Sequence, residues 1–352
     1  MQLLSLAVTL SVLAPAVNSA ASDTVLLASR RGGWIEAIRL DTLQTVSRIR
    51  VPTMVERVAS DVSGQQLFVI AHKTRQSGCC VLFALDPQSL QLSSLLEPVQ
   101  SATFTIDRLF TQRGNMGIEV FDSHTLIHLP TIRTPGIYQL RPSPDGQRLF
   151  GITHWPEPSL DLFDIGQGVM IARKAVTGVS TLTGAWLGPQ YFLFTVQSGR
   201  AKLWPVRSDD GEMGHAVSLS FAGSFWDCKL TPYDVIASGA RLVIYGQFGL
   251  KSDGACAVPG GFLVVDPATG AVTDRLASSL RFRQMVASSD GRALWGLDVG
   301  DPAWGKVRIV KIDAATGQVI DEKLLDSDIW YLTTGQIPHE MQGHLDLTAM
   351  IP

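Results

Sequence analysis

The chain has few charged residues for its length. Asp, Glu, Lys and Arg make up 17% of its 352 residues, and the formal net charge is -3. The Lys and Arg residues are spread along the sequence, so no basic stripe is available to neutralise a phosphate backbone. Nucleic acid is therefore not expected as a partner.

Long apolar runs are missing after the first residues, so no membrane-spanning helix is expected. The opening apolar run, residues 3–17, is itself too short and too interrupted by hydroxyl residues and Pro15 to span a bilayer. Small residues follow at 19–21, as a signal peptidase requires. We therefore predict a signal peptide at residues 1–21 and a periplasmic or secreted protein. Because no Lys or Arg precedes the apolar run, a misassigned start or a buried N-terminal strand is the alternative.

Cysteine is also rare, and no Cys-x-x-Cys spacing occurs. The four cysteines are Cys79, Cys80, Cys228 and Cys256. Neighbouring residues of a strand point to opposite faces, so the adjacent pair is not expected to share a metal ion. His339 and His344 are five residues apart, whereas a helical zinc pair needs a spacing of four. We therefore predict no metal site. An even number of cysteines in an exported chain instead permits two disulfides, with three possible pairings.

Linker-like segments are missing as well. No stretch rich in Pro, Gly and Ser or in charge divides the chain. Hydrophobic residues make up 45% of the sequence, which is enough to form a large core. We therefore predict one folded domain over residues 22–335, followed by a C-terminal tail over residues 336–352.

The sequence does contain a repeated unit, in which an apolar run ends in Asp, turns and continues into a second apolar run. An Asp at this position is suited to an Asx-turn, because its carboxylate accepts hydrogen bonds from backbone groups about two residues on. A degenerate seventh copy precedes Asp209 and Asp210. The six well-formed copies end at Asp41, Asp86, Asp122, Asp164, Asp266 and Asp313.

A second turn signal opens another strand ahead of most copies, as at Ser63-Gly64, Asp145-Gly146 and Asp290-Gly291. The order within a unit is therefore strand, tight turn, strand, loop, strand, Asp turn, strand. Neighbouring Asp residues are 45, 36, 42 and 47 positions apart (41 to 86, 86 to 122, 122 to 164 and 266 to 313). These spacings are typical of a four-stranded blade of roughly 40 to 50 residues.

The two ends of the chain complete one unit between them. The mature sequence begins with only three strands, near residues 24–28, 34–40 and 45–51, and a lone strand at residues 329–333 comes after the last unit. That lone strand can serve as the innermost strand of the first unit, which removes exposed sheet edges. We therefore predict an all-β fold, a seven-bladed β-propeller of four-stranded antiparallel blades closed by a C-terminal strand. An open sandwich is the alternative, but it would not need seven equivalent units.

Residues 142–150 (PSPDGQRLF) and 264–272 (VVDPATGAV) resemble the repeats of the YVTN-type bacterial propellers. Residues 144–221 and 262–335, with the closing segment YLTTG at 331–335, are similar to the heavy, non-catalytic chain of quinoprotein amine dehydrogenases of the methylamine dehydrogenase type. The resemblance covers about half of the chain. It implies a periplasmic subunit whose partner light chain carries the tryptophan tryptophylquinone cofactor, with no cofactor in this chain. The Cys79-Cys80 pair departs from the heavy-chain pattern, so a propeller without a light chain is also compatible.

Functional side chains are expected on one face of the ring, where loops between the second and third strands and between blades lie around the channel. The imidazole of His154 is suited to proton transfer and the Trp155 indole to stacking on a ligand, although an ordinary surface loop is the alternative. The candidates for ligand or partner contacts are His72, Arg113, His154, Trp155, Glu157, Trp226, Arg283, Asp298, Trp304 and Trp330.

Two classes of function are compatible with these observations. The first is a binding or scaffold protein whose channel face engages a light-chain-like partner or a small ligand. The second is a stand-alone propeller enzyme, lactonase- or lyase-like, that uses His154, Glu157 and either His72 or Asp298. No Gly-x-Ser-x-Gly nucleophile elbow is found, so hydrolysis through that motif is not expected.

The cysteine positions generate the first testable prediction. Cys228 lies near the start of an innermost strand and Cys256 in the long loop of the same blade, so we expect their Cα atoms within the ~4.4–6.8 Å of a disulfide. The bond should stabilise the protein by about 2–4 kcal/mol, because it restricts the unfolded chain. Mass spectrometry of the non-reduced, digested protein should find this cross-link. A link from Cys79 or Cys80 to either distant cysteine would contradict it; otherwise these two form a vicinal disulfide or remain thiols.

Overall fold

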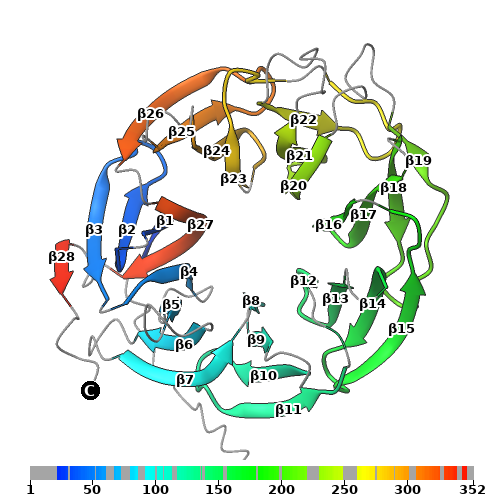
Figure 1. The fold of residues 1–352 in the computed structure, drawn as a ribbon, viewed down its shortest axis with the longest axis horizontal. Coiled ribbons are helices and arrows are strands. Elements are labelled where there is room, and N and C mark those ends of the chain that lie inside the picture. Colours follow the sequence, from blue (N-terminus) through cyan, green and yellow to red (C-terminus); the bar gives the residue numbers. More distant parts are fainter. Residues whose placement is uncertain are drawn as a thin grey trace, which may run out of the picture.

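The computed structural model of the protein describes residues 22–346 except for residues 31, 52, 61–66, 73–79, 86–91, 100, 106, 113–116, 135, 137–138, 154–156, 180, 198–199, 220–229, 249–259, 274–275, 289, 301–306, 326–328 and 339–342. Every described element is a β-strand, and the strands form seven sheets arranged as blades around a common axis (Figure 1). The predicted all-β, seven-bladed propeller is therefore confirmed.

Each blade runs from an innermost strand near the axis to an outermost strand at the rim. In this order, blade 1 has β27 (Ile329–Pro338), β1 (Ser22–Arg30), β2 (Trp34–Arg39), β3 (Thr45–Arg50) and β28 (Gly343–Asp346). Blade 2 has β4 (Val55–Ser60), β5 (Leu67–His72), β6 (Cys80–Leu85) and β7 (Leu92–Val99), and blade 3 has β8 (Ser101–Phe104), β9 (Arg108–Gln112), β10 (Ile118–Asp122) and β11 (His128–Ile132). Blade 4 has β12 (Gln139–Pro142), β13 (Arg148–Thr153), β14 (Ser159–Asp164) and β15 (Val169–Ala175), and blade 5 has β16 (Thr181–Leu187), β17 (Gln190–Gln197), β18 (Arg200–Val206) and β19 (Val217–Ser218). Blade 6 has β20 (Leu230–Ser238), β21 (Arg241–Phe248) and β22 (Phe262–Val265), and blade 7 has β23 (Phe282–Ala287), β24 (Ala293–Asp298), β25 (Val307–Asp313) and β26 (Val319–Leu325).

The ring is closed by the two ends of the chain, as the sequence predicts. Strand β27 pairs antiparallel with β1 along its whole length, from Ser22 opposite Pro338 to Arg30 opposite Ile329. The C-terminal strand therefore supplies the innermost strand of the blade that the N-terminal strands begin. This pairing leaves no break between blade 7 and blade 1 (Figure 1).

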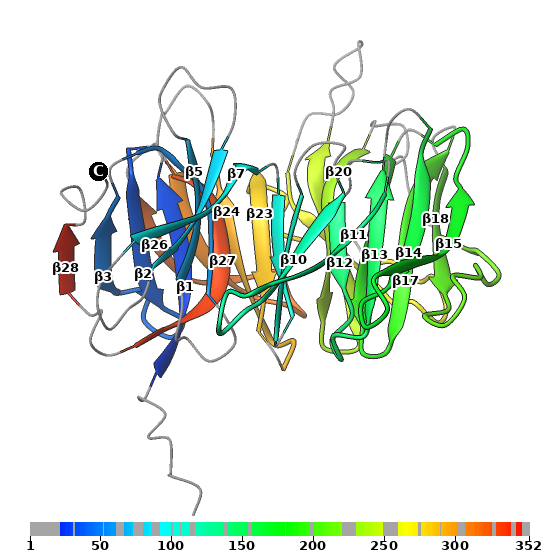
Figure 2. The same ribbon diagram turned by 90° about the horizontal axis from the view of Figure 1, so that it is seen from below.

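The segment expected to be a C-terminal tail contributes two further pieces of sheet. Strand β27 continues past residue 335 to Pro338, because Ser22 to Thr24 on β1 offer it further pairing partners. Strand β28 then pairs in parallel with β3 on the outer rim of the same blade (Figure 2). Blade 1 thus has five strands, and its outer edge is covered.

Blade 6 differs from the predicted four-stranded blade, because only three strands of it are regular in the described part of the chain. Where the fourth strand would lie, two isolated bridges join Val265 to Val272 and Phe262 to Leu276. The Asp turn at Asp266 is intact, so the chain reverses as expected. Over its described residues the chain then continues beside β22, where Thr273 and Leu276 bond to the backbone of Val264 and Phe262.

The hydrophobic core is divided among the seven seams between blades. Each seam contains one cluster of buried apolar side chains drawn from the two blades that face each other. In β1, for example, Val25 and Leu27 pack toward blade 2, whereas Leu26 and Ala28 pack toward blade 7. Strands buried on both faces explain why the sequence shows continuous apolar runs rather than strict alternation.

The Asp residues of the repeat form the predicted turns. The Asp122 carboxylate accepts hydrogen bonds from the backbone N–H groups of His124 and Thr125, at 3.0 and 2.7 Å. Asp266 and Asp313 accept the corresponding pair of bonds in their own blades. These backbone donors favour the ionised form and lower the pKa of each of these carboxyl groups. Each Asp therefore stays charged at neutral pH and holds the turn between the third and fourth strands.

The predicted disulfide between Cys228 and Cys256 lies outside the described residues, as does Cys79. Cys80 begins β6 and lies directly opposite His72 on β5. In the part of the chain that the structure describes, no helix has the length and hydrophobicity needed to span a bilayer.

Ring closure generates the second prediction. Removing residues 328–352 should abolish soluble folding, because β1 then presents an unpaired edge and the seam between blades 1 and 7 loses Ile329 and Leu332. Size-exclusion chromatography and circular dichroism would detect aggregation and loss of the native spectrum. Removing only residues 339–352, which carry β28 but leave β27, is the matched control and should preserve the fold. A monomeric, folded protein after the longer truncation would contradict the role of β27.

Candidate functional site

The innermost strands of the seven blades surround the axis of the ring (Figure 1). Each innermost strand starts at the end of the disc where the second strand of a blade is joined to the third. We call this end the loop face. Each ends at the opposite end, the turn face, where the tight turns and the Asp turns lie (Figure 2). These strands are β27, β4, β8, β12, β16, β20 and β23.

Four of the innermost strands contain a β-bulge in the half nearer the loop face, and they belong to the consecutive blades 6, 7, 1 and 2. In each, the pairing register with the second strand skips one residue of the innermost strand. These residues, which we call the bulge arc, are Tyr233, Arg283, Trp330 and Glu56. Strands β8, β12 and β16 pair without a register shift over their described residues. Because bulges redirect side chains and are enriched beside active sites, the bulge arc is the candidate site.

Glu56, the bulge residue of blade 2, contacts a predicted site residue. Its Oε1 lies 2.6 Å from Nε2 of His72, which ends β5 at the loop face. The two side chains are 27% and 21% exposed, so the pair is partly buried yet reachable from solvent. A carboxylate held against an imidazole fixes the orientation of the ring. This arrangement is suited to binding a polar ligand or to proton transfer.

Side chains directly after the bulges join neighbouring blades. The guanidinium carbon of Arg57 lies 5.7 Å from the centre of the Tyr331 ring, which joins blade 2 to blade 1 by a cation–π contact. The side-chain oxygen of Gln284 accepts a hydrogen bond of 3.0 Å from the backbone N–H of Leu332, which joins blade 7 to blade 1. Three of the four blades of the bulge arc, blades 7, 1 and 2, are therefore joined beside their bulges.

A second polar cluster joins blades 4 and 5 to blade 6. Nη2 of Arg141 on β12 donates to Oδ1 of Asp234 on β20 at 2.5 Å, and the Thr183 hydroxyl on β16 donates to the same oxygen at 3.0 Å. Nε of Arg141 also donates to the carbonyl of Gly184 at 3.1 Å. These contacts join blades 4, 5 and 6 at their innermost strands. Burial opposes the charged guanidinium, but the Asp234 carboxylate outweighs it and raises the pKa of Arg141.

Two buried tyrosines lie near this ion pair. Burial is the main cause that raises the pKa of both Tyr191 and Tyr245 well above the usual value, and the Asp234 charge adds to the effect. Both hydroxyls therefore stay protonated. The Tyr191 hydroxyl has no hydrogen-bond partner among the described residues. Its ring stacks on Phe150 at 4.2 Å between centroids, so packing rather than hydrogen bonding holds it in place.

The structure brings several of the predicted site residues to the bulge arc. Arg283 and the backbone of Trp330 are bulge positions, and His72 contacts the bulge residue Glu56. Glu157 lies apart from them, exposed before β14. The remaining ligand candidates lie outside the described residues: Arg113, His154, Trp155, Trp226 and Trp304.

The side chain of Asp298 is enclosed by the protein and holds neighbouring groups in place. Its carboxylate is almost fully buried, accepts the backbone N–H of Arg281 at 2.7 Å, and lies 2.8 Å from Nε of Arg308. The N–H of Gly300 donates to it as well, at 3.1 Å. These bonds fix the chain where it enters and leaves the first two strands of blade 7. A buried carboxylate that is saturated in this way is not available to a ligand.

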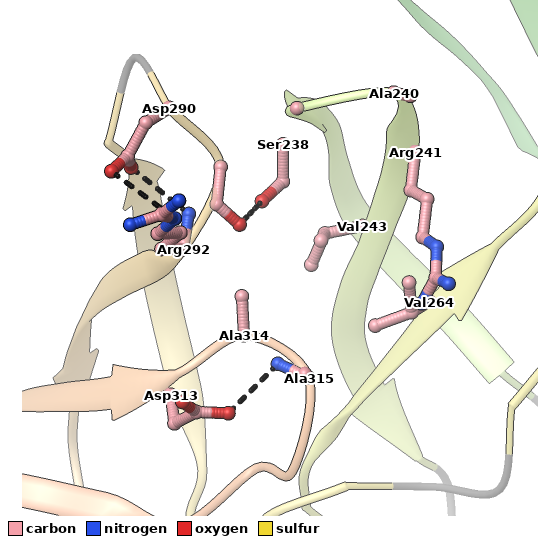
Figure 3. A pocket seen from close by; sticks show the side chains of 12 residues that line it. Ser238, Ala240, Arg241, Val243, Val264, Asp290, Arg292, Asp313, Ala314 and Ala315 are labelled. Atoms are coloured by element: carbon pink, nitrogen blue, oxygen red, sulfur yellow. Dashed lines mark hydrogen bonds and ion pairs between the residues drawn. The ribbon is translucent and has the colours of Figure 1, made fainter.

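One hollow of about 390 Å³ lies on the turn face between blades 6 and 7 (Figure 3). The Ser238 hydroxyl donates to the Gly291 carbonyl at 3.1 Å, and Asp290 and Asp313 are held in their own turns (Figure 3). Val243 and Val264 beneath it are 0% and 4% exposed, so packed side chains close the floor. Because both of its carboxylates are bound within the turns, the hollow lacks the convergent free polar groups of a ligand site.

The sequence reasoning missed Glu56, Arg57, Arg141 and Asp234, because it searched the loops and only some of the strand entries between blades. A usable signal was present in two of them. Arg141 and Asp234 are single charges in otherwise apolar strands, a few residues before the turn signals at Ser143 and Ser238. Within the described residues, no group of three or more His, Cys, Asp or Glu side chains is placed to hold a metal ion.

Comparison with known proteins places the fold but not a family. No protein-family model matches the sequence, and no curated protein matches it either. The chain is similar to the periplasmic gluconolactonase of Pseudomonas aeruginosa, with a TM-score of 0.62 and 14% identity over 90% of this chain and 99% of the other. It is also similar to a hydrazine synthase chain of Kuenenia stuttgartiensis, with a TM-score of 0.54 and 14% identity over 74% and 76%. A third match is an oligogalacturonate lyase in complex with manganese, with a TM-score of 0.56 and 13% identity over 85% of each chain. Such likeness shows the propeller fold alone.

The Arg141–Asp234 pair generates the third prediction. Asp234→Asn should lower the free energy of unfolding by about 1–3 kcal/mol, because it leaves a partly buried guanidinium without its counter-charge. Urea unfolding of D234N, R141M and the double variant would measure this. The double variant should lose less than the sum of the single changes, since the second change removes the unpaired charge. Asp209→Asn, at a carboxylate 76% exposed, is the control and should change stability little. Additive losses would contradict the pairing.

Proposed function

We propose that this protein is a binding propeller whose ligand or partner engages the bulge arc at the loop face. The observation that carries the proposal is that blades 6, 7, 1 and 2 each distort the innermost strand at corresponding positions. A bulge interrupts the sheet ladder and weakens it locally. Four consecutive bulges around one axis therefore favour a shared functional purpose over an accident of packing.

The chemistry of these strands supports recognition of a small anionic or aromatic group. Arg57 is exposed and its charge lies over the Tyr331 ring, while Glu56 and His72 form a hydrogen-bonded pair beside it. A guanidinium over an aromatic ring offers a planar donor set for a carboxylate. The imidazole adds a group that can donate or accept a hydrogen bond.

The proposal includes a scaffold role in an exported assembly, in keeping with the resemblance to the heavy chain of amine dehydrogenases. In that role, the loop face would dock a light-chain-like protein that carries tryptophan tryptophylquinone. This chain would supply the docking face and would hold no part of the cofactor. The signal peptide expected at residues 1–21 supports export to the periplasm.

A second candidate function rests on the Glu56–His72 contact. An imidazole within 2.6 Å of a carboxylate, both partly exposed, is the usual arrangement of a general base and its orienting group. A lactonase- or lyase-like reaction would use His72 to remove a proton and Glu56 to stabilise the resulting imidazolium. Asp298, which the sequence offered for this role, is saturated by structural bonds.

A ligand screen tests the proposal and is the fourth prediction. A thermal-shift screen of small carboxylates, sugar lactones and primary amines should find compounds that raise the melting temperature of the wild-type protein. Arg57→Ala and Glu56→Gln should remove that shift, because they remove the guanidinium and the carboxylate of the site. Arg241→Ala, an equally exposed change on the turn face, is the matched control and should retain the shift.

Turnover in the same screen separates the two candidate functions. If the protein opens a lactone, His72→Gln should slow the reaction by about a hundredfold or more, the usual contribution of a general base. Binding without turnover supports the binding protein. A shift that survives both R57A and E56Q, or that R241A removes, would contradict a site at the bulge arc.

A further inference from the structure

The Arg141–Asp234 pair leaves one nitrogen and one oxygen without a hydrogen bond. Arg141 uses Nε for the Gly184 carbonyl and Nη2 for Oδ1 of Asp234, at 3.1 and 2.5 Å. Oδ1 of Asp234 also accepts from the Thr183 hydroxyl at 3.0 Å and from the Val235 backbone N–H at 2.9 Å. Among the described residues, neither Nη1 of Arg141 nor Oδ2 of Asp234 has a hydrogen-bond partner. We call these two the open atoms.

Other enclosed aspartates that pair with arginine have both oxygens bonded. Asp161 gives both of its oxygens to Arg173. Asp164 and Asp298 each give one oxygen to an arginine and the other to a backbone N–H. Charged hydrogen-bonding atoms that are partly enclosed are normally satisfied, so an exception calls for a physical reason. Asp234 is that exception among these four carboxylates.

The open atoms belong to side chains on the inner wall of the ring. Arg141 lies on β12 and Asp234 on β20, and β16 lies between these two innermost strands (Figure 1). The Arg141 side chain crosses β16, where it bonds to the Gly184 carbonyl. The side chains of Arg141 and Asp234 are 25% and 22% exposed, so a solute can reach them.

Both charged groups are held in position by the protein itself. Nε of Arg141 is fixed on the Gly184 carbonyl, and the backbone carbonyl of Arg141 accepts a hydrogen bond of 3.0 Å from Nε1 of Trp186. The Asp234 carboxylate is fixed by the Thr183 hydroxyl and by a backbone N–H of its own strand. A ligand that meets groups fixed in advance pays little conformational entropy for ordering them. The pair is therefore preorganised for binding.

The charges of the pair select a neutral ligand group. An anion bound to Nη1 of Arg141 would lie close to the Asp234 carboxylate, and a cation bound to Oδ2 of Asp234 would lie close to the guanidinium. Tyr191 and Tyr245, which lie near Arg141, add no charge, because burial raises the pKa of both well above the usual value. Each open atom belongs to the same planar group as an atom of the Nη2–Oδ1 bond, so one small group can bridge the two.

We propose that Arg141 and Asp234 form a binding position for a neutral small molecule that presents a hydrogen-bond acceptor and a donor on neighbouring atoms. Nη1 of Arg141 donates to the acceptor, and Oδ2 of Asp234 accepts from the donor. A vicinal diol of a sugar and a primary carboxamide both present this combination. Hydrogen bonds to charged groups are stronger than those between neutral groups, so two of them hold a small ligand. The position is independent of the anion-binding role of Arg57 at the bulge arc.

Ligand-observed NMR titrations of the full mature chain test the proposal with two probes, methyl α-D-glucopyranoside for the diol and propionamide for the carboxamide. At least one probe should bind the wild-type protein, and the probe that binds identifies the ligand class. Asp234→Asn should weaken this binding by about tenfold or more, because it turns the open acceptor into a donor. Arg141→Lys should do the same, since it keeps the charge but removes the open Nη1.

A matched control separates binding from stability, because D234N and R141K also weaken an ion pair. Arg148 lies in the same blade as Arg141 and pairs with Asp164, whose other oxygen is bonded to a backbone N–H. Arg148→Lys weakens this pair without opening or closing a ligand position, so it should retain the wild-type affinity for the probe. Thermal melts of all three variants would establish that each is folded at the temperature of the titration.

Four outcomes would overturn the proposal. If neither probe binds the wild-type protein, the pair does not hold a neutral ligand. Binding that R141K and D234N leave unchanged would place the site elsewhere. An equal loss in R148K would show that the variants act through stability alone. Displacement of the bound probe by sodium acetate at equal concentration would show that the open donor selects anions.

Discussion

The pairing of β27 with β1 is the interaction on which the other contacts of the ring depend. Each blade has two apolar faces, and each face is buried only if a neighbouring blade lies against it. An open array of blades would leave one such face and one sheet edge exposed at each end. Because β27 comes from the end of the chain and β1 from its start, their ladder joins the two ends and completes the seams on both sides of blade 1.

This constraint also determines where function can lie. The faces of the sheets are committed to the seams, so a ligand or partner can reach only the ends of the strands and the inner and outer edges of the blades. The bulge arc uses the inner edge. A bulge gives a strand one residue outside the ladder register, so a polar side chain such as Glu56 enters there without disturbing the apolar registers on either side.

The architecture was predictable because its signals are local and repeated. Asp122, Asp266 and Asp313 mark the turns by their own hydrogen bonds, and the apolar runs between them are buried on both faces. The irregular outer part of blade 6 was not predictable, since Asp266 forms the same turn as in the other blades and only packing decides whether a regular strand comes after it. The strand over residues 343–346 was missed because it pairs in parallel with β3, which is almost three hundred residues away in the sequence.

The site was less accessible to sequence reasoning than the fold. His72, Arg283 and Trp330 were identified by their expected position at the loop face, and the structure places all three at the bulge arc. Glu56 and Arg57 were missed because a bulge is a property of two paired strands, and neither strand alone shows it. Asp298 was selected for its expected place at the loop face, yet its carboxylate binds the backbone N–H of Arg281 and the side chain of Arg308.

The bulges of the innermost strands are confined to one side of the ring over the described residues. Blades 6, 7, 1 and 2 contain the four bulges, the closure ladder, the fifth strand and the incomplete outer sheet. Blades 3 and 4 have four strands each, and their innermost strands pair without a register shift over the described residues. Blade 1 must differ from the other blades, because it is built from both ends of the chain. The bulges in blades 7 and 2 therefore lie beside a blade that is itself irregular. The bulge arc therefore lies on the same side of the ring as the closure ladder.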